Sequence, residues 1–188
     1  MRAILLNGPP SSGKDTIGGM LWRKFQGSHV VKFSQPIIDF MLREFSIDMN
    51  RVDKDMLHPH TPGRTPRQVA IAYSENFCKP LFGPVYFGYT AVEKLQAYSK
   101  TGVEVAIYTD SGFVQEAKPV LDYCGKGRVL QVVLHRNGCH FSNDSRSIWE
   151  HPDIGRVEFE NKAPTIEALK QDVEKFLMPE IEGWLIHS

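Results

Sequence analysis

The sequence predicts an α/β fold in which a parallel sheet of roughly five strands is covered by helices on both faces. Short apolar runs alternate along the chain with segments of helical length and helical periodicity. The first run, residues 3–6, is continuously apolar and is closed by Asn7 and Gly8, as expected for a strand buried on both faces of a parallel sheet. Such sheets have right-handed crossovers and bind ligands beyond the carboxyl ends of their strands, so chemistry is expected there.

The first elements follow in order from this pattern. A loop rich in Gly, Pro and Ser comes after the first strand, and a helix is predicted over about 14–25. Residues 30–33 form a second short strand. A helix over 36–45 is predicted because apolar residues recur at the spacing i, i+3, i+4, i+7, at Ile38, Met41, Leu42 and Phe45.

The middle of the chain begins with a polar segment, residues 46–64, which contains prolines and is predicted as a loop. A helix then starts sharply, because Thr65 can cap it, Pro66 suits its first position and Gln68 completes a capping box. This helix is expected to end at about residue 77.

The remaining elements are predicted from the same two periodicities. Gly88 is expected to weaken the next helix at its middle. A polar segment without periodicity later in the chain is expected to be mobile, because core packing cannot pin it. In chain order we expect a helix over 84–99, a strand over 103–108, a helix over 113–123, a strand over 129–134, the polar segment over 136–152, a strand over 156–159 and a helix over 165–177.

Bulk composition limits the partners of the protein. The 188 residues suffice for one domain, 1–188, with a real core. Lys plus Arg and Asp plus Glu are both 22, and this zero formal net charge offers no field for a nucleic acid, so no such partner is expected. The three Cys imply no disulfide framework and favour a reducing cytoplasm. No apolar run is long enough for a signal peptide or membrane span, so no membrane partner is expected either.

The loop after the first strand has the spacing of a phosphate-binding P-loop. Gly8 and Gly13 permit a tight turn whose backbone N–H groups point inward, and the following helix adds the positive end of its dipole. Lys14 is expected to reach the β- and γ-phosphates of a nucleotide. Asp15 stands where Ser or Thr is usual, and it is a candidate either for water-mediated contact with Mg²⁺ or for orienting the acceptor. The residues expected to hold ATP here are Gly8, Ser11, Ser12, Gly13, Lys14, Asp15 and Thr16.

The end of the third predicted strand points to a transferase. Hydrolytic motor ATPases usually end this strand in Asp-Glu, whereas here Asp110 is followed by Ser111 and Gly112. Asp110 is therefore predicted to contact Mg²⁺ through water, the alternative being a helix or turn cap.

Phosphoryl transfer also requires cations at the transferring oxygens. The candidates are Arg64 and Arg67 at the start of the capped helix, Arg136 at the end of the fourth strand, and Arg146 in the polar segment. Arg146 is the favoured catalytic arginine, because a lid over a nucleotide needs a cation on its inner side.

With these motifs the chain resembles the deoxynucleoside monophosphate kinases of tailed bacteriophages. The similarity is loose outside the Gly-Lys-Asp-Thr run but extends over nearly the whole chain. One position departs from the pattern, because those kinases carry an arginine where this chain has Gly112; either Arg146 or Arg64 takes that role, or the acceptor differs. The matching segments are Gly13–Thr16, Phe33–Asp39, Thr65–Gln68, Tyr108–Phe113 with Glu116 and Ala117, Val132–Arg136, and Asn161.

The resemblance implies a cytoplasmic kinase that depends on ATP and Mg²⁺ and is a homodimer in many members. It implies an acceptor-binding helical region over about 35–100 and a lid over about 136–152, within a three-layer P-loop kinase fold. It also implies that Arg136 and Asn161 belong to the ATP site. Residues expected at the acceptor are Phe33, Ser34, Asp39, Arg64 and Arg67.

The predicted function is therefore phosphoryl transfer from ATP to a (deoxy)nucleoside monophosphate. Two alternatives stay open. One is a P-loop kinase for another small phosphorylated metabolite, and the other is a nucleotide-binding regulatory module without catalysis.

Overall fold

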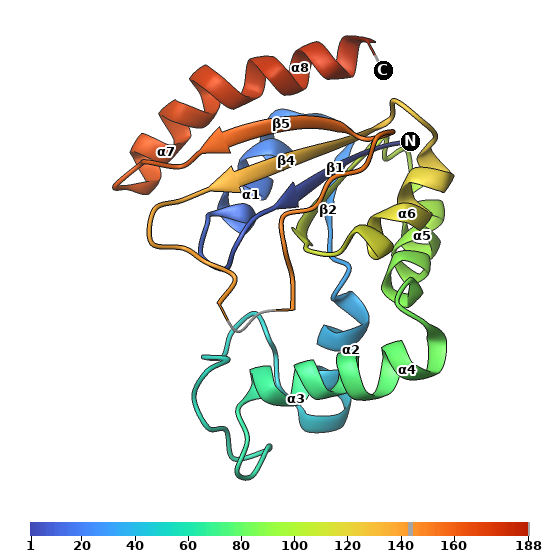
Figure 1. Ribbon diagram of the computed structural model, residues 1–188, viewed down its shortest axis with the longest axis vertical. Coiled ribbons are helices and arrows are strands. Elements are labelled where there is room, and N and C mark those ends of the chain that lie inside the picture. The colour runs from blue at the N-terminus through green and yellow to red at the C-terminus, as the bar shows by residue number, and fades with distance from the viewer. Residues whose placement is uncertain (143–144, 188) are drawn as a thin grey trace.

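The computed structural model describes residues 1–142 and 145–187, and its centre is a five-stranded sheet in which every pair of neighbouring strands is parallel. The strand order is β2-β3-β1-β4-β5 (Figure 1), which confirms the predicted α/β class. The strands are β1 (Arg2–Asn7), β2 (Ser28–Val31), β3 (Val105–Ser111), β4 (Val129–His135) and β5 (Gly155–Glu160).

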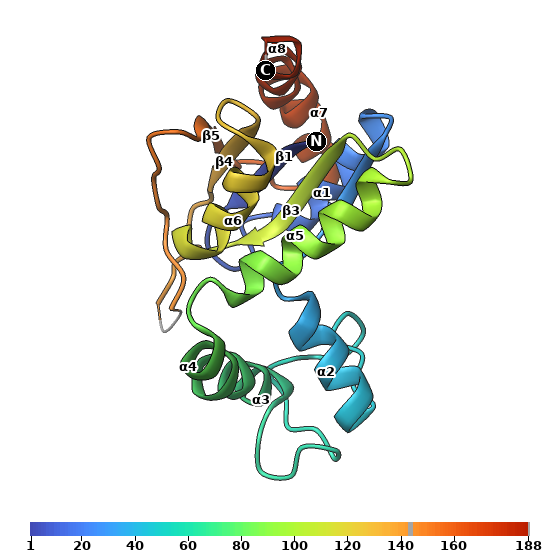
Figure 2. The same cartoon turned by 90° about the vertical axis from the view of Figure 1, so that its right-hand side faces the viewer.

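Helices cover both faces of the sheet and give three layers (Figure 2). In β1, Ala3 and Leu5 face one layer while Ile4 and Leu6 face the other, and all four are fully buried. This explains why the first strand is a continuous apolar run instead of an alternating one. One layer consists of α5 (Tyr86–Ser99) and α6 (Val114–Cys124); the other consists of α1 (Lys14–Lys24), α7 (Ile166–Asp172) and α8 (Met178–His187).

Three further helices lie apart from these layers, beneath the sheet in the view of Figure 1. They are α2 (Gln35–Phe45), α3 (Pro66–Ala72) and α4 (Lys79–Phe82), and α3 starts with the predicted capping box. A small core of Met41, Ile47 and Met49 holds this region together. The predicted acceptor-binding region of 35–100 thus contains this group and also α5, which belongs to a layer on the sheet.

Two helices continue well beyond their predicted ends through widened π-helical turns. Turn η1 (Tyr73–Cys78) carries α3 into α4, and turn η2 (Val173–Leu177) carries α7 into α8. In each case a proline, Pro80 or Pro179, follows directly as the second residue of the next helix. Proline lacks an N–H and its ring crowds the preceding turn, so a widened turn lets the helix continue past it.

The second and third strands also differ from their predicted limits. β2 ends at Val31, so Lys32 and Phe33 lie just past the strand instead of within it. β3 extends to Ser111 and therefore includes Thr109 and Asp110. Both shifts place polar side chains at the carboxyl edge of the sheet, where the site lies.

Candidate functional site

The loop between β1 and α1 has the backbone geometry that the P-loop pattern predicts. Ser11 has φ 62° and Gly13 has φ 104°, so both lie in the left-handed region that reverses the chain tightly. A side chain at Gly8 would place its Cβ 2.7 Å from the carbonyl oxygen of Leu134 in β4. The glycine therefore lets the loop sit directly on the neighbouring strand.

Lys14 lies across the mouth of this loop. Its Nζ donates hydrogen bonds to the carbonyl oxygens of Gly8 at 2.7 Å and Pro9 at 2.6 Å, and the residue is buried. An ammonium group held over a turn lined by backbone N–H groups forms a cationic seat for phosphate oxygens.

Two residues predicted to contact ATP contact the loop itself. Arg136 Nη1 donates to the carbonyl oxygen of Ser11 at 3.0 Å, and Asn161 Nδ2 donates to that of Ser12 at 3.0 Å. Asn161 is buried, and its Oδ1 also accepts from the backbone of Ala163. The structure thus gives Asn161 the role of supporting the phosphate loop from behind.

Asp15 is poised beside β3. Its Oδ1 accepts a hydrogen bond from Thr109 Oγ1 at 2.8 Å and pairs with Lys32 Nζ at 3.1 Å. Partial burial acts to raise the pKa of this carboxyl, but the charge of Lys32 and the Thr109 hydrogen bond outweigh it and lower the pKa. Asp15 is thus an ionised carboxylate at the phosphate loop, which fits Mg²⁺, an ion held by one or two carboxylates together with substrate phosphates. Thr16, which follows it, is exposed.

The carboxylate of Asp110 is hydrogen-bonded to the residues at the start of α2. One of its carboxylate oxygens accepts from the backbone N–H of Phe33 at 2.9 Å, and the other accepts from the backbone N–H and hydroxyl of Ser34 at 2.9 and 2.6 Å. The geometry is that of the alternative reading, a cap supplied across the fold from β3. Water-mediated contact with Mg²⁺ stays a prediction.

A cavity of about 560 Å³ opens from the phosphate loop toward the helical group. It brings together most of the predicted catalytic and acceptor residues. Two predicted residues are not brought there: Asp39 is exposed and accepts a hydrogen bond from Gln35, and Arg64 is exposed in the loop before α3. Of the predicted site residues, the cavity is lined by Ser11, Lys14, Asp15, Phe33, Ser34, Arg67, Asp110 and Arg146.

Cations gather at one end of this cavity. Lys32 and Lys54 line it together with Arg67, whose Nη2 donates to Asp55 at 3.0 Å. Burial, and then repulsion from Lys32 and Arg67, lowers the pKa of Lys54. The sequence analysis did not identify Lys32 and Lys54 as site residues. Lys32 could have been found, because a lysine inside the apolar run of residues 30–33 is unusual.

The opposite end of the cavity carries carboxylates. Glu116, in the first turn of α6, is only 5% exposed, and burial, opposed by Lys79 and reinforced by Asp110 and Glu75, raises its pKa to about 8. Lys79 Nζ lies 2.7 Å from a Glu75 oxygen and 4.0 Å from Glu116 Oε1. Sequence reasoning assigned no role to Glu75 or Lys79, because only folding brings η1 and α4 onto α6.

Arg146 reaches the cavity over Gly112. A Cβ built on Gly112 would overlap the Arg146 side chain, lying 2.8 Å from its Cβ and closer still to Cγ and Cδ. The aliphatic stem of Arg146 therefore occupies the space left by the missing side chain at 112. Of the two candidates, Arg146 and Arg64, only Arg146 lines the cavity among the described residues.

The polar segment of 136–152 was predicted to be mobile along its whole length, but part of it is fixed to the sheet. Asn7 Nδ2 donates to the carbonyl oxygen of Ser147 at 3.0 Å, and Gln131 Nε2 donates to that of Trp149 at 2.8 Å. Trp149 itself is buried in the core beside α5 and α6. The prediction that core packing cannot pin this segment is therefore wrong for its second half. The sequence also places Asp144 close enough to Arg146 to predict an ion pair between them in an open state, and Asp144 lies outside the described residues.

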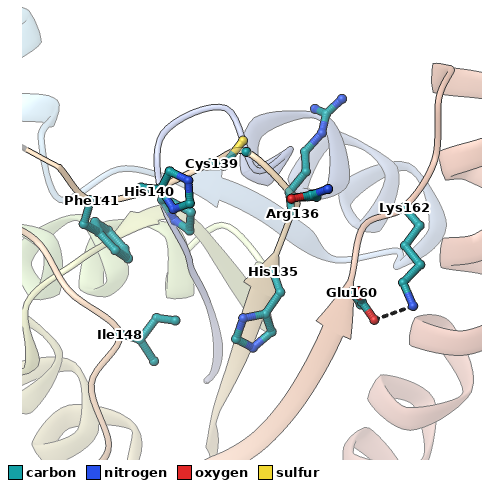
Figure 3. Close-up of a pocket in the computed structure, with 11 residues that line it drawn as sticks. His135, Arg136, Cys139, His140, Phe141, Ile148, Glu160 and Lys162 are labelled. Carbon is teal, nitrogen blue, oxygen red and sulfur yellow. Dashed lines mark ion pairs between the residues drawn. The ribbon is translucent and has the colours of Figure 1, made fainter.

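A second cavity, of about 780 Å³, opens on the other side of the phosphate loop. Pro9 and Arg136 line it at the loop, and Figure 3 shows His135 in its middle, with Phe141 and Ile148 to one side. Glu160 and Lys162 lie to the other side and form an ion pair of 2.7 Å.

Other site chemistries find no support in residues 1–142 and 145–187. No three His, Cys, Asp or Glu side chains in these ranges come close enough together to hold a metal ion. No helix in the same ranges has the length and apolar character that crossing a membrane requires.

Comparison with known proteins shows a likeness of fold. A sugar kinase from a Janibacter species superposes with a TM-score of 0.53 at 12% identity, over 93% of each chain. The likeness is one of fold. Thymidylate kinase from Candida albicans has a TM-score of 0.44 at 14% identity, over 95% of this chain and 92% of its own. APS kinase from Mycobacterium tuberculosis has 0.43 at 13%, over 94% and 96%. No family model and no curated protein sequence matches the chain.

Proposed function

We propose that this protein transfers a phosphoryl group from ATP to a (deoxy)nucleoside monophosphate and releases the diphosphate. The observation that carries the proposal is the cavity of about 560 Å³, which begins at Lys14 of the phosphate loop and has cations at one end. Its size is that of a small-molecule site, typically about 300–1,000 Å³. In a chain of zero net charge, such a local concentration of Lys and Arg favours a phosphorylated acceptor.

Each of the two cavities receives one of the two substrates. The phosphates of ATP lie on the loop under Lys14, and the larger cavity beyond Pro9 and Arg136 receives its adenosine. Asp15 would hold Mg²⁺, which would supply positive charge to the transferring phosphates when bound.

The acceptor occupies the other cavity. Its phosphate pairs with Lys32, Lys54 and Arg67, which places it beside the phosphate loop. Phe113 lines the same cavity and offers an aromatic ring to the base. Arg146 supplies positive charge as the phosphoryl group moves between the two substrates.

A coupled assay of ADP release with a panel of acceptors tests the proposal. A nucleoside monophosphate kinase releases ADP only when one of these nucleotides is present. Release only with a phosphorylated sugar or other metabolite would establish the first alternative, a kinase with a different acceptor. Release without any acceptor would indicate a hydrolase, and ATP binding without release a regulatory module.

Lys14→Met tests whether the loop performs the chemistry. Turnover should fall by about a thousandfold, because a main cation at the transferring phosphate is lost. Since Lys14 is buried and bonds to two loop carbonyls, we also expect a small drop in melting temperature. Lys170→Met, at an exposed position of α7, is the matched control and should change neither quantity. Normal turnover in Lys14→Met would refute the P-loop assignment.

The kinship with phage deoxynucleoside monophosphate kinases belongs to the same proposal and is supported by the motifs quoted above. The homodimeric state and the cytoplasmic location are also proposals. Light scattering of the purified protein tests the first.

A further inference from the structure

One part of the cavity proposed for the acceptor nucleotide is lined by carboxyl groups, which accept hydrogen bonds. Glu75 and Glu116 line it, and Lys79, which is not among the lining residues, balances both carboxylates. The aromatic ring of Phe113 lies beneath the Lys79 ammonium, 3.7 Å from Nζ to the ring centre. A phosphate would be repelled from this end, so the base of the acceptor must face it.

We propose that Glu116 selects the base of the acceptor by accepting a hydrogen bond from an exocyclic amino group. This inference rests on the proposed function and names the class of acceptor: bases that carry an amino group, as opposed to their oxo counterparts.

The first argument is that Glu116 is buried without a hydrogen bond. It is 5% exposed and lines the cavity, yet no described residue donates a hydrogen bond to it, and its nearest cation, Lys79, is 4.0 Å away and bonded to Glu75. The acceptor atoms of Glu116 therefore remain available to the cavity, where a ligand that supplies an N–H can form a hydrogen bond with them.

The second argument is the chemistry of the two kinds of base. A carboxylate only accepts hydrogen bonds, so it attracts an amino group and repels a carbonyl oxygen at the same position. Cytosine is then favoured over uracil, and adenine over hypoxanthine. For a hydrogen bond to a charged group, worth about 1.5–3 kcal/mol, the preference is about 10- to 100-fold.

The third argument is that this selection depends on protonation. A protonated Glu116 can also donate, so it tolerates an oxo base, whereas the carboxylate does not. The charged groups facing Glu116 are Lys79 from α4, Glu75 from η1, Asp110 from β3 and Arg146 from the segment before β5. Together with burial they raise the pKa of Glu116 to about 8, so amino selectivity should increase as the pH rises through that value.

Two matched acceptor pairs test the inference, deoxycytidine against deoxyuridine monophosphate and deoxyadenosine against deoxyinosine monophosphate. The ratio of kcat/KM within each pair is measured at pH 6 and pH 9, and the affinity for each nucleotide is measured by calorimetry. In the wild type, the amino member of the preferred pair should lead by at least about tenfold at pH 9 and by less at pH 6.

Glu116→Gln should reduce this ratio and abolish its pH dependence while leaving the KM for ATP unchanged, since an amide can donate to an oxo base and does not titrate. Glu116→Met fills the same space without polar atoms and gives the same readout should the amide variant fold poorly. Glu93→Gln, the same substitution at an exposed site on α5, is the matched control.

A preference for oxo bases in the wild type, or an unchanged ratio in Glu116→Gln, overturns the inference while leaving the kinase activity intact. If none of the four nucleotides is phosphorylated, the proposed function fails. Calorimetry then decides the inference alone: equal affinities within each pair overturn it, and tighter binding of the amino member supports it.

Discussion

At Gly112 the lack of a side chain makes room for an arginine from another part of the chain. Arg146 lies over this glycine, and the backbone N–H of Ser147 donates to the carbonyl oxygen of Gly112 at 3.1 Å. Under the proposed function, the segment that follows β4 would thus supply the arginine that the resemblance leads us to expect at position 112. Its position depends on a contact with one glycine.

This contact predicts strong coupling between the two positions. Arg146→Ala should lower kcat about 100-fold with little change in the KM for ATP, because its contact forms mainly in the transition state. Arg146→Lys should recover part of the loss, since lysine lacks the planar fork that grips two phosphate oxygens. Gly112→Ala should also lower kcat, about tenfold or more, because the new methyl group displaces the Arg146 stem.

In the double variant Gly112→Ala/Arg146→Ala, the alanine at 112 should have almost no further effect, since the side chain that it displaces is gone. Steady-state kinetics of the four proteins measures this coupling. If the two losses simply multiply, Gly112 acts independently of Arg146.

Glu116 also makes stability depend on pH. Its pKa is about 8 in the folded protein against 4.5 for an ordinary Glu, so between these values the folded state binds more protons than the unfolded state. The free energy of unfolding should therefore fall as the pH rises from about 5 to 8. Relative to Glu116→Gln, the wild type should lose on the order of 3 kcal/mol across this range, measured by urea denaturation at each pH. Parallel curves for the two proteins would show that Glu116 is ionised freely in the fold.

At the scale of elements, the contact between α5 and α6 explains why α5 contains a glycine, Gly88. Gly88 was expected to weaken its helix, yet a Cβ there would overlap the carbonyl oxygen of Glu116 and lie 2.8 Å from Pro119 Cγ. The two helices thus approach closely at this point, beside the carboxylate end of the cavity. The glycine is required by packing, whatever it costs in helix propensity.

Two glycine-to-alanine substitutions in helices should consequently have opposite signs. Gly88→Ala should destabilise the protein by about 1–3 kcal/mol, because a backbone neighbour must move. Gly19→Ala, in α1, meets no atom within 4 Å and should stabilise it by about 0.4–1 kcal/mol through helix propensity. Chemical denaturation measures both, and a stabilised Gly88→Ala would show that the helices can separate without cost.

Features that depend only on residues close together in the sequence were predicted correctly. The phosphate loop, the capping box at Thr65 and the buried first strand depend on neighbouring residues, and all three were found from sequence. The approach of Lys54 to Asp15 depends on the path of the long loop over residues 46–64, which no periodicity encodes. Whether a residue contacts a ligand or supports a contact also requires coordinates, as Asn161 and Asp110 show.

For the molecule as a whole, the segment between β4 and β5 has two different halves. Its second half is fixed to the sheet through Asn7, Gln131 and the buried Trp149. Closure over the nucleotides, if it accompanies catalysis, must therefore involve the first half, which carries His140 and Phe141 along the larger cavity.

Hydrogen exchange can separate the two halves. Amides of residues 137, 138 and 140–142 should exchange fast in the free protein and slow by about tenfold or more when ATP and acceptor are both bound, since closure excludes water. The amide of Ser147, which is hydrogen-bonded to Gly112, should be protected in both states. Equal exchange of residues 137, 138 and 140–142 with and without ligands would mean that this segment has no lid function.

The central place of β1 in the sheet bears on how the chain folds while it is being synthesised. β1 leaves the ribosome well before its partners β3 and β4, which begin only at residues 105 and 129. Until they emerge, the phosphate loop lacks Leu134 behind Gly8, and Asn161, which holds Ser12, comes later still. Long-range pairing of this kind is slow to form. The nascent chain consequently completes its phosphate loop only after residue 161 has emerged, so a ligand of this loop cannot guide the folding of the elements that emerge earlier.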